Sequence, residues 1–225
     1  SLVGSEMCIR DRCIISGGMI EPDFAFPYLQ KQQFDIILAA DRGLEFCYHY
    51  QIMPTYILGD FDSLSPEILN YYKENHVAPI REFNPVKDAS DTEIAIRLAM
   101  TLGASEIYIL GATGGRIDHL WANVQTLTIP FKAGVDAVIL DSQNKIRLIG
   151  GDTVIRREDA YGPYFSIFPL GQEIYSLSIE GAKYPLHGHQ LTPYDSLCVS
   201  NQFEEEEVKI TFGSGTVSYT HLRAH

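Results

Sequence analysis

Two short acidic segments contain the residues best suited to bind a metal ion or take part in catalysis. Their members are Asp60 and Asp62 in the first segment, and Lys87, Asp88 and Asp91 in the second. Carboxylate oxygens are among the ligands that Mg²⁺ prefers, and a bound Mg²⁺ normally shares its shell with phosphates and water. Four aspartates in two loops therefore predict a Mg²⁺ site that also takes a phosphorylated substrate.

Each acidic segment alone has a simpler interpretation. Asp60 and Asp62 would suit a solvated turn. Ser90 or Asp91 would suit the N-terminus of a helix, where backbone amides and the helix dipole favour anions. A cap accounts for one of these residues, but not for both aspartates of the second segment together with Lys87. The two segments taken together favour the metal site.

A glycine-rich segment, residues 111–116, is the second candidate for phosphate chemistry. Its sequence is Gly-Ala-Thr-Gly-Gly-Arg. Such glycines let the backbone around Thr113 and Gly114 approach an anion closely, and Arg116 can clamp phosphate oxygens. The segment is neither a Walker A loop nor a G-x-G-x-x-G fingerprint. An ordinary turn would also use glycine here.

Four further residues have both a functional and a structural interpretation. Asp41 follows an apolar segment, at the position where nucleoside-binding folds often contact ribose or base. Asp118 and His119 begin a predicted helix, where an N-cap and a surface histidine are the simpler interpretations. Trp121, the only tryptophan, is expected to lie in the core.

Alternating strand and helix patterns must position these residues. Apolar strands are expected at residues 13–16, 35–40, 55–58, 106–110 and 135–140. Helices are expected after the second strand up to residue 50, and at residues 66–75, 91–102 and 118–127. The helix at residues 91–102 begins with a capping box from Ser90 to Glu93 and stops at Gly103. The alternation predicts a Rossmann-like α/β domain, whose parallel sheet binds ligands at the carboxyl ends of its strands.

The pattern changes after about residue 143, which predicts a second domain. Short alternating segments separated by Gly, Pro and Asp predict a small antiparallel β-sandwich. Its strands are expected at residues 145–149, 153–156, 164–168, 174–179, 196–200 and 207–212. We expect the α/β domain at residues 13–142 and the β-sandwich at residues 143–215. The ends, residues 1–12 and 216–225, lack this patterning and are expected to be non-native or disordered.

The composition of the chain argues against several classes of function. A formal charge of −12 and a pI near 4.9 argue against non-specific nucleic-acid binding, which needs a basic face. No apolar run reaches the roughly 18 residues needed to span a bilayer, and residues 1–12 carry charges where a signal peptide is apolar. The cysteines form no CxxC pair and no zinc spacing. We expect a cytoplasmic protein with no nucleic-acid or membrane partner.

Seven stretches keep the order and spacing of one known family. They are IISGG (14–18), ILAADRG (37–43), PTYILGDFDS (54–63), KDASDTEIAI (87–96), GATGGRIDHLWAN (111–123), GAKYPL (181–186) and VSNQF (199–203). Over about residues 13–215 the chain resembles the thiamine pyrophosphokinases. The resemblance implies an enzyme that transfers the diphosphate of ATP to the hydroxyl of thiamine, with Mg²⁺ as cofactor and AMP as product. It also implies a homodimer whose thiamine site is completed across the subunit interface.

The resemblance implies roles for individual residues. Asp60, Asp62, Asp88 and Asp91 match the residues that form the family's Mg²⁺ and diphosphate site. These aspartates, together with Arg116 and Asp118, match its catalytic residues. Nucleotide contacts are matched by Asp41, Lys87, Thr113, Gly114 and Arg116. Thiamine contacts are matched by Asp118, Ser200 and Asn201.

The chain departs from the family in three places. Ser90 replaces a common threonine, and Gln202 replaces a frequent glutamate that would place a charge near the thiazolium cation. The last strand should continue in apolar residues after Gly213 but runs into THLRAH, so dimer or substrate contacts of that strand are expected to differ.

Three other functions fit part of the pattern. A Mg²⁺-dependent phosphohydrolase also uses D-x-D after a strand, but it leaves the glycine-rich segment unexplained. A regulator that only binds thiamine or a nucleotide would be expected to lack a complete set of aspartates. A related pyrophosphokinase acting on a pterin alcohol is separated only by its substrate. The base that accepts the hydroxyl proton is left open between Asp91 and Asp118.

Overall fold

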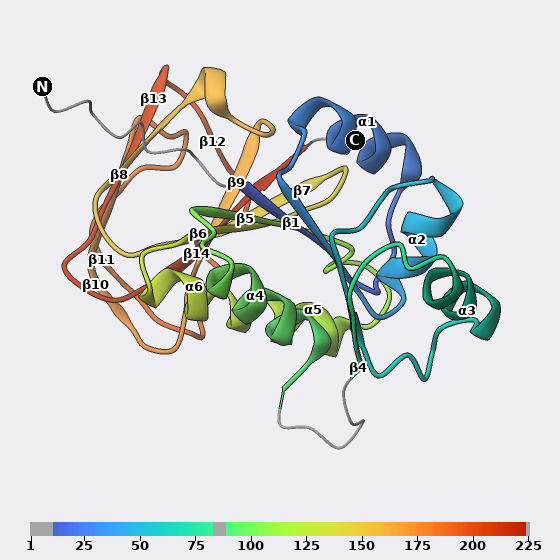
Figure 1. Ribbon diagram of the computed structural model, residues 1–225. Helices are drawn as coiled ribbons and strands as arrows, with labels where there is room; N and C mark the ends of the chain where they lie inside the picture. The colour runs from blue at the N-terminus through green and yellow to red at the C-terminus, as the bar shows by residue number, and fades with distance from the viewer. Residues whose placement is uncertain (1–10, 83–88, 224–225) are drawn as a thin grey trace, which may run out of the picture. The chain divides into compact units, whose positions relative to one another are not determined.

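The chain divides into two compact units, Ser1–Ala137 and Val138–His225. The computed structural model describes residues 11–82 and 89–223 (Figure 1). Within those residues no helix is long and apolar enough to cross a membrane. The chain has a mixed α/β fold, as expected, with parallel strands in the first unit and a separate antiparallel sheet in the second.

The first unit contains a five-stranded parallel arrangement. Its strands are β1 (Asp11–Ile15), β2 (Ile36–Ala40), β3 (Tyr56–Gly59), β4 (Ile80–Glu82) and β5 (Glu106–Leu110). Their order is β5-β1-β2-β3-β4, and every pair is parallel. The inner strands are buried apolar runs, as is typical of a parallel sheet covered on both faces.

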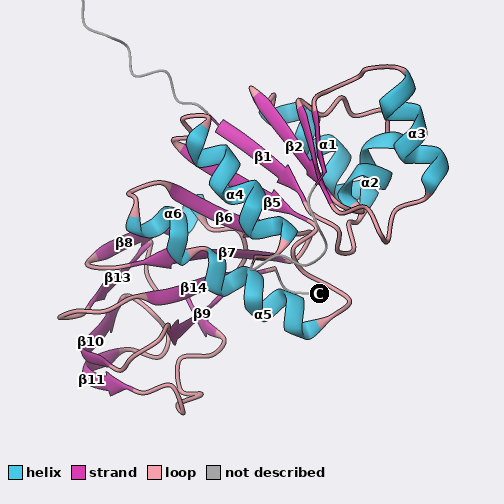
Figure 2. Cartoon of the chain, turned by 60° about the horizontal axis from the view of Figure 1, so that its bottom comes forward, coloured by secondary structure: helices cyan, strands magenta, loops and turns pink. Residues whose placement is uncertain are grey.

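Helices cover both faces of this sheet. They are α1 (Pro22–Gln32), α2 (Gly43–His49), α3 (Pro66–Glu74), α4 (Asp91–Thr101), α5 (Ile117–Thr126) and α6 (Thr128–Lys132). α1 and α4 lie on opposite faces (Figure 2). The chain moves from β1 outward to β4 and then returns through α4 to β5 on the other side of β1. A switch point of this kind, between β1 and β5, is where open α/β sheets bind ligands.

The start of α4 confirms one half of the predicted capping box. The Ser90 hydroxyl accepts a hydrogen bond from the Glu93 N–H at 3.2 Å. The Glu93 carboxylate does not return the contact, and instead accepts from the Arg97 guanidinium at 2.9 and 2.7 Å. The helix start is therefore fixed by Ser90, and Glu93 supports the first turns through an i,i+4 ion pair.

The second unit is antiparallel. Its strands are β6 (Asp136–Leu140, which crosses the division), β7 (Asn144–Ile149), β8 (Thr153–Arg156), β9 (Tyr164–Pro169), β10 (Ile174–Glu180), β11 (Leu186–Leu191), β12 (Asn201–Gln202), β13 (Glu207–Thr211) and β14 (Val217–Leu222). One set runs in the order β12-β9-β14-β7-β6, and a four-stranded sheet runs β11-β10-β13-β8. Side chains of both sets share one apolar cluster, with Phe165, Leu177, Ile210 and Val217 at its centre.

Several expectations about single elements are wrong. Residues 196–200 form turns rather than a strand, and Leu197 and Val199 are exposed. Strands β4 and β11 and helix α1 were not expected from the sequence. The expectation of a disordered C-terminal end is wrong for β14, which pairs with β7 on one side and β9 on the other. Alternate side chains of β14 enter the core, since Val217, Tyr219 and His221 are at most 4% exposed.

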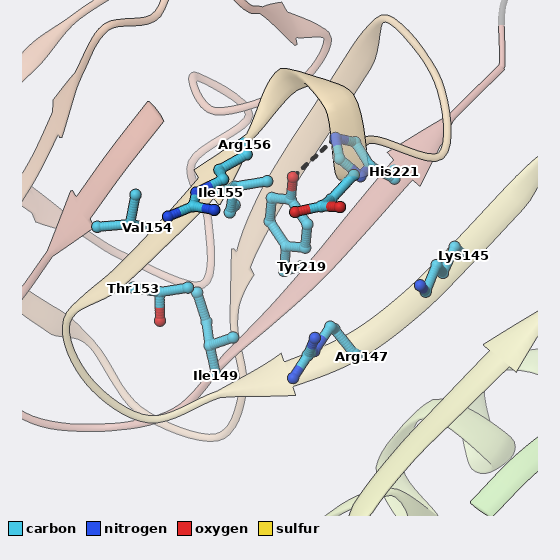
Figure 3. A pocket seen from close by; sticks show the side chains of 10 residues that line it. Lys145, Arg147, Ile149, Thr153, Val154, Ile155, Arg156, Tyr219 and His221 are labelled. Carbon is cyan, nitrogen blue, oxygen red and sulfur yellow. Dashed lines mark hydrogen bonds between the residues drawn. The ribbon is translucent and has the colours of Figure 1, made fainter. Parts of the chain in front are cut away.

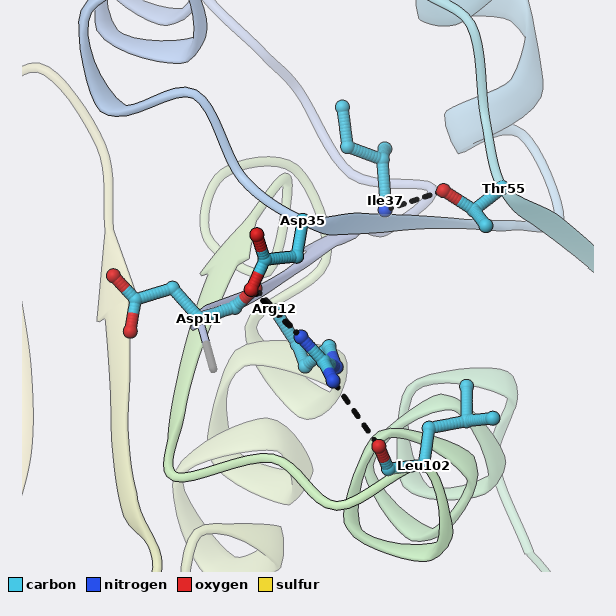
Figure 4. A network of polar contacts seen from close by, with 6 residues as sticks. All are labelled: Asp11, Arg12, Asp35, Ile37, Thr55 and Leu102. Atoms are coloured by element: carbon cyan, nitrogen blue, oxygen red, sulfur yellow. Dashed lines mark hydrogen bonds and ion pairs between the residues drawn. The ribbon is translucent and has the colours of Figure 1, made fainter. Parts of the chain in front are cut away.

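The first strand also begins earlier in the chain than expected. Residues 1–10 lie outside the described residues, but Asp11 and Arg12 belong to β1. Arg12 is 4% exposed. Its guanidinium donates to the Leu102 carbonyl oxygen at 3.1 Å and lies 3.4 Å from the Asp35 carboxylate (Figure 4). Leu102 is the C-terminal cap of α4, so Arg12 connects β1 to the end of that helix.

Replacing Arg12 should measurably destabilise the first unit. Arg12→Met keeps the aliphatic stem but leaves the Leu102 carbonyl without its donor, which we expect to cost about 1–3 kcal/mol. Asp35→Asn is the matched control, and it should cost less because the Asp35 side chain is 60% exposed. Urea unfolding of both variants measures the difference. Equal stability of Arg12→Met and the parent would show that the contact to α4 contributes nothing.

Candidate functional site

Four loops meet at the carboxyl edge of the parallel strands. The Ser16 N–H donates to the Leu110 carbonyl, and the Gly18 N–H donates to the Gly111 carbonyl, both at 2.8 Å. These two bonds join the loop after β1 to the loop after β5. The Asp41 N–H donates to the Leu58 carbonyl at 2.8 Å, which joins the loop after β2 to the end of β3. The segments predicted after β1, β2 and β5 are therefore tied to neighbouring strands or loops at this edge.

Glycines allow this close packing of loops. A Cβ atom on Gly43 would lie 2.0 Å from the Ile15 carbonyl oxygen, and one on Gly111 would lie 2.3 Å from the Ser16 carbonyl oxygen. Both distances are far inside van der Waals contact. Gly111 also has a φ of +69°, a left-handed conformation that favours glycine. The spacing between β1 and its neighbouring loops thus depends on glycine at these positions.

Asp41 is at the centre of the acidic residues. It has a left-handed φ of 47° and is half-buried. Its Oδ2 accepts from the Ser63 hydroxyl at 3.2 Å, while its buried Oδ1 has no hydrogen-bond partner among the described residues. Burial raises the pKa of Asp41, and the charges of Asp91 and Asp60 raise it further. Two loop aspartates, Asp41 and Asp60, and Asp91 at the start of α4 are therefore close enough to interact electrostatically.

The loop after β3 holds Asp60 and Asp62 around a buried phenylalanine. The Asp60 carboxylate accepts from the Asp62 N–H at 3.2 Å. Phe61 between them is only 6% exposed and adopts a left-handed φ of 60°. Gly59 gives its ring room, because a Cβ there would lie 3.2 Å from the ring. Phe61 thus anchors the loop, while Asp62 is left exposed to solvent.

The first turn of α4 is tied to the end of β1. Asp91 is the first residue of the helix. The next residue, Thr92, is buried, and its hydroxyl shares a 2.6 Å hydrogen bond with that of Ser16. Neither hydroxyl was singled out from the sequence. The available signal was the place of Ser16 directly after a strand and of Thr92 directly after the candidate Asp91.

A hydrogen bond from α5 holds the glycine-rich segment in place. The Asn123 side chain is buried and donates to the Ala112 carbonyl at 3.0 Å. Thr113 is also buried, while Gly114 and Gly115 have left-handed φ values of 77° and 74°. Asn123 was quoted in the motif without a role. Its contact fixes the start of the segment, so the glycines beyond it are presented at the edge.

Arg116 and Asp118 form an exposed ion pair at the end of this segment. The Asp118 carboxylate accepts from Arg116 Nε at 3.1 Å and from Nη2 at 2.5 Å. The hydrogen bond from Arg116 lowers the pKa of Asp118 to about 2. A carboxylate with so low a pKa is a weak proton acceptor at neutral pH. The His119 N–H also donates to Asp118, at 3.0 Å.

The expectation that Trp121 lies in the core is wrong. Trp121 is 66% exposed and Ile117, one turn earlier, is 79% exposed. The buried side chain of α5 is Asn123. The helix therefore turns Asn123 inward, where it holds the glycine-rich segment, and exposes Ile117 and Trp121.

Trp121 provides a simple optical test of this arrangement, because it is the only tryptophan. The fluorescence of the folded protein should be quenched by acrylamide almost as strongly as that of the urea-unfolded chain. Trp121→Phe should remove the signal without changing stability, since an exposed ring contributes little to the core. Strong protection from acrylamide in dilute protein would contradict the exposed position.

Several predicted residues lie elsewhere. Lys87 and Asp88 lie outside the described residues. Ser200 and Asn201 belong to the second unit. The Ser200 N–H donates to the Ser166 hydroxyl at 3.0 Å. Asn201 is buried and its amide holds the backbone of Tyr184, accepting at 3.0 Å and donating at 2.8 Å.

The acidic residues do not form a complete metal cage. Among residues 11–82 and 89–223, no group of three His, Cys, Asp or Glu side chains is arranged to hold a metal ion. Asp60, Asp62 and Asp91 still offer carboxylate oxygens at one edge of the sheet. This donor set fits Mg²⁺, which takes one or two carboxylates and completes its shell with substrate phosphates and water.

The parallel strands and the switch point are typical of α/β proteins that bind ligands at the carboxyl ends of their strands. Residues 28–139 match the catalytic domain of thiamin pyrophosphokinase, and residues 152–217 match its vitamin B1 binding domain. Together the two matches cover most of the chain. The chain belongs to the thiamine pyrophosphokinase family.

Similar proteins agree in both sequence and fold. The thiamine pyrophosphokinase of Bacillus subtilis is 28% identical over 178 residues, which are 79% of this chain and 83% of that protein. The crystal structure of the Bacillus subtilis enzyme has a TM-score of 0.82 at 25% identity and covers 96% of this chain and 100% of that one. The enzyme from Geobacillus thermodenitrificans has a TM-score of 0.80 at 27% identity, covering 95% and 98%.

Proposed function

We propose that this chain transfers the diphosphate of ATP to the hydroxyl of thiamine, giving thiamine diphosphate and AMP. The observation that carries the proposal is the electrostatic proximity of Asp41, Asp60 and Asp91 at the carboxyl edge of the sheet, where the loop after β1 also contacts the glycine-rich segment. Carboxylates that lie close together repel one another, and the metal ion of a metal-bound diphosphate supplies positive charge that offsets this repulsion. ATP as co-substrate follows from the family.

We assign the metal site to Asp60, Asp62 and Asp91, together with Asp88. The loop around Phe61 holds the first two in place, and the Ser16–Thr92 hydrogen bond holds the third. Mg²⁺ bound there would neutralise charge on the transferred diphosphate. Asp41 is assigned to the nucleotide, because its buried and unpaired Oδ1 can accept from a hydroxyl of the ligand.

We assign the phosphate cradle to Thr113, Gly114 and Arg116, with Lys87 from the neighbouring segment. Arg116 is exposed, so its guanidinium can leave Asp118 for a phosphate oxygen. While the ion pair holds, the low pKa of Asp118 makes it a weak base. Once Arg116 has moved to a phosphate oxygen this cause of the low pKa is gone, so the acceptor of the thiamine proton is either Asp118 or Asp91. Alignment of the hydroxyl with the β-phosphorus supplies the rest of the rate enhancement.

The reaction is identified by its nucleotide product. The protein with ATP, Mg²⁺ and thiamine should form AMP and thiamine diphosphate in equal amounts, and excess EDTA should stop both. ADP with thiamine monophosphate would contradict attack at the β-phosphorus. Inorganic phosphate without a thiamine product would favour a phosphohydrolase, and turnover of a pterin alcohol in place of thiamine would favour the related pyrophosphokinase.

The thiamine-binding role of Ser200, the homodimer and the cytoplasmic location stay predictions. We also propose that the two units are a Rossmann-like domain and a β-sandwich. The shared apolar cluster of the second unit supports the latter. The hydrogen bonds of Asn201 favour an indirect role, in which it shapes the loop that carries the exposed Tyr184.

A further inference from the structure

The second unit contains a cavity of about 220 Å³ that none of the assigned residues touches. It lies among β7, β8 and β14, as Figure 3 shows. Lys145 and Arg147 of β7 line one side, and Arg156 lies on β8 opposite them. The remaining lining residues are Ile149, Thr153, Val154, Ile155, Asp159, Tyr219 and His221.

The lining of this cavity is positively charged. Lys145, Arg147 and Arg156 are set against one carboxylate, that of Asp159. Arg156 also contacts Glu207 outside the lining at 3.3 Å, through an exposed ion pair that solvent weakens. Three cations around one cavity are unusual in a chain with a net charge of −12. The excess of cationic over anionic side chains in the lining favours a ligand that carries negative charge.

The hydrogen bonds of His221 show that its ring is neutral and donates inside the cavity. His221 Nδ1 accepts from the Tyr161 N–H at 3.3 Å, so this nitrogen carries no proton. Burial, with the charge of Lys145, lowers the pKa of His221 to about 4, which keeps the ring neutral. Its proton is therefore on Nε2, which lies 2.8 Å from the Tyr219 hydroxyl and donates to it.

The Tyr219 hydroxyl is then an acceptor toward His221 and still has its own O–H to donate. Tyr219 is only 4% exposed, and no described residue accepts from this hydroxyl. A buried donor without an acceptor is costly, commonly about 1–3 kcal/mol. Burial raises the pKa of Tyr219, and the charge of Arg147, which lines the same cavity, acts in the opposite direction. An oxyanion bound in the cavity would accept from the hydroxyl and interact with the charge of Arg147.

We propose that this cavity binds the phosphate group of a small phosphorylated molecule, at a site separate from the residues assigned to catalysis. A phosphate offers three oxygens that accept from several directions, which suits donors on three different strands better than the two oxygens of a carboxylate. The apolar side chains of Ile149, Val154 and Ile155 face the non-charged part of the ligand. The positive charge comes from β7 and β8, outside the unusual residues 216–225.

The site is tested by NMR on the full chain with labelled histidine, titrated with inorganic phosphate in EDTA. The His221 ring signal should shift and saturate. Arg147→Gln should weaken binding about tenfold, as for loss of a charge-assisted hydrogen bond, and Tyr219→Phe should weaken it severalfold. Lys209→Gln is the matched control, because Lys209 is an exposed cation of β13 outside the cavity, and it should change nothing.

Three outcomes would overturn the proposal. One is an unshifted His221 signal at high phosphate, and another is equal weakening by Lys209→Gln, which would indicate diffuse charge attraction. The third is acetate binding as tightly as phosphate, which would assign the cavity to carboxylates. If Arg147→Gln does not fold, Lys145→Gln removes a cation from the same strand and serves in its place.

Discussion

Replacing Asp60 with asparagine should lower kcat by about two to three orders of magnitude, as for other deletions of a group that stabilises transferred charge. The substitution keeps the shape of the side chain. An amide oxygen can still accept from the Asp62 N–H, so the loop around Phe61 should stay in place. What is lost is one negative charge at the assigned metal site. Asp91→Asn should have an effect of similar size.

Steady-state assays of AMP formation measure this effect, and circular dichroism verifies the fold. Asp23→Asn is a suitable control, because Asp23 is an exposed acid in the first turn of α1 and is assigned no role. Its kcat should stay near that of the parent. Raising Mg²⁺ should partly restore the Asp60→Asn variant if the aspartate acts by binding the metal. Near-normal kcat in both Asp60→Asn and Asp91→Asn would refute the assignment of the acidic edge.

Gly43→Ala should be among the most damaging single substitutions for stability. The added Cβ would lie 2.0 Å from the Ile15 carbonyl oxygen, which is backbone inside a central strand and cannot move aside cheaply. Either β1 or the start of α2 must shift, with an expected cost above about 4 kcal/mol, at the upper end for single substitutions. Thermal unfolding of the purified protein, or its loss from the soluble fraction, measures the effect.

Gly151→Ala is the matched control for this prediction. Gly151 has nothing within 4 Å of the new Cβ and no left-handed φ, so the change should be close to neutral. A Gly43→Ala protein with the melting temperature of the parent would show that the packing of α2 against β1 is looser than described.

Most of the first unit could be predicted because its strands are continuous apolar runs that end in acidic or glycine residues. β2 and β5 were placed correctly for that reason, and Asp41 and Gly111 follow them as expected. Helix α1 was missed, since Pro27 inside it and its mixed polarity obscure the helical period. Trp121 was placed in the core because apolar side chains usually are, and the burial of Asn123 reverses that rule for α5.

The acidic residues of the candidate site were visible from the sequence, but the contacts that hold them were not. The Ser16–Thr92 hydrogen bond joins residues 76 positions apart, and nothing local in the chain indicates it. The same is true of the second unit. The segment after residue 216 alternates apolar and polar residues only from Val217 to Thr220, and its pairing with β7 and β9 is what makes it a strand.

The position of β14 has a consequence for how the chain is made. It leaves the ribosome well after its partners β7 and β9, which precede it in the chain. Until β14 emerges, those two strands present unpaired edges and an uncovered apolar core, the features that make nascent chains aggregate. The second unit can complete its fold only once β14 has emerged, and a truncation before residue 217 would leave both edges open.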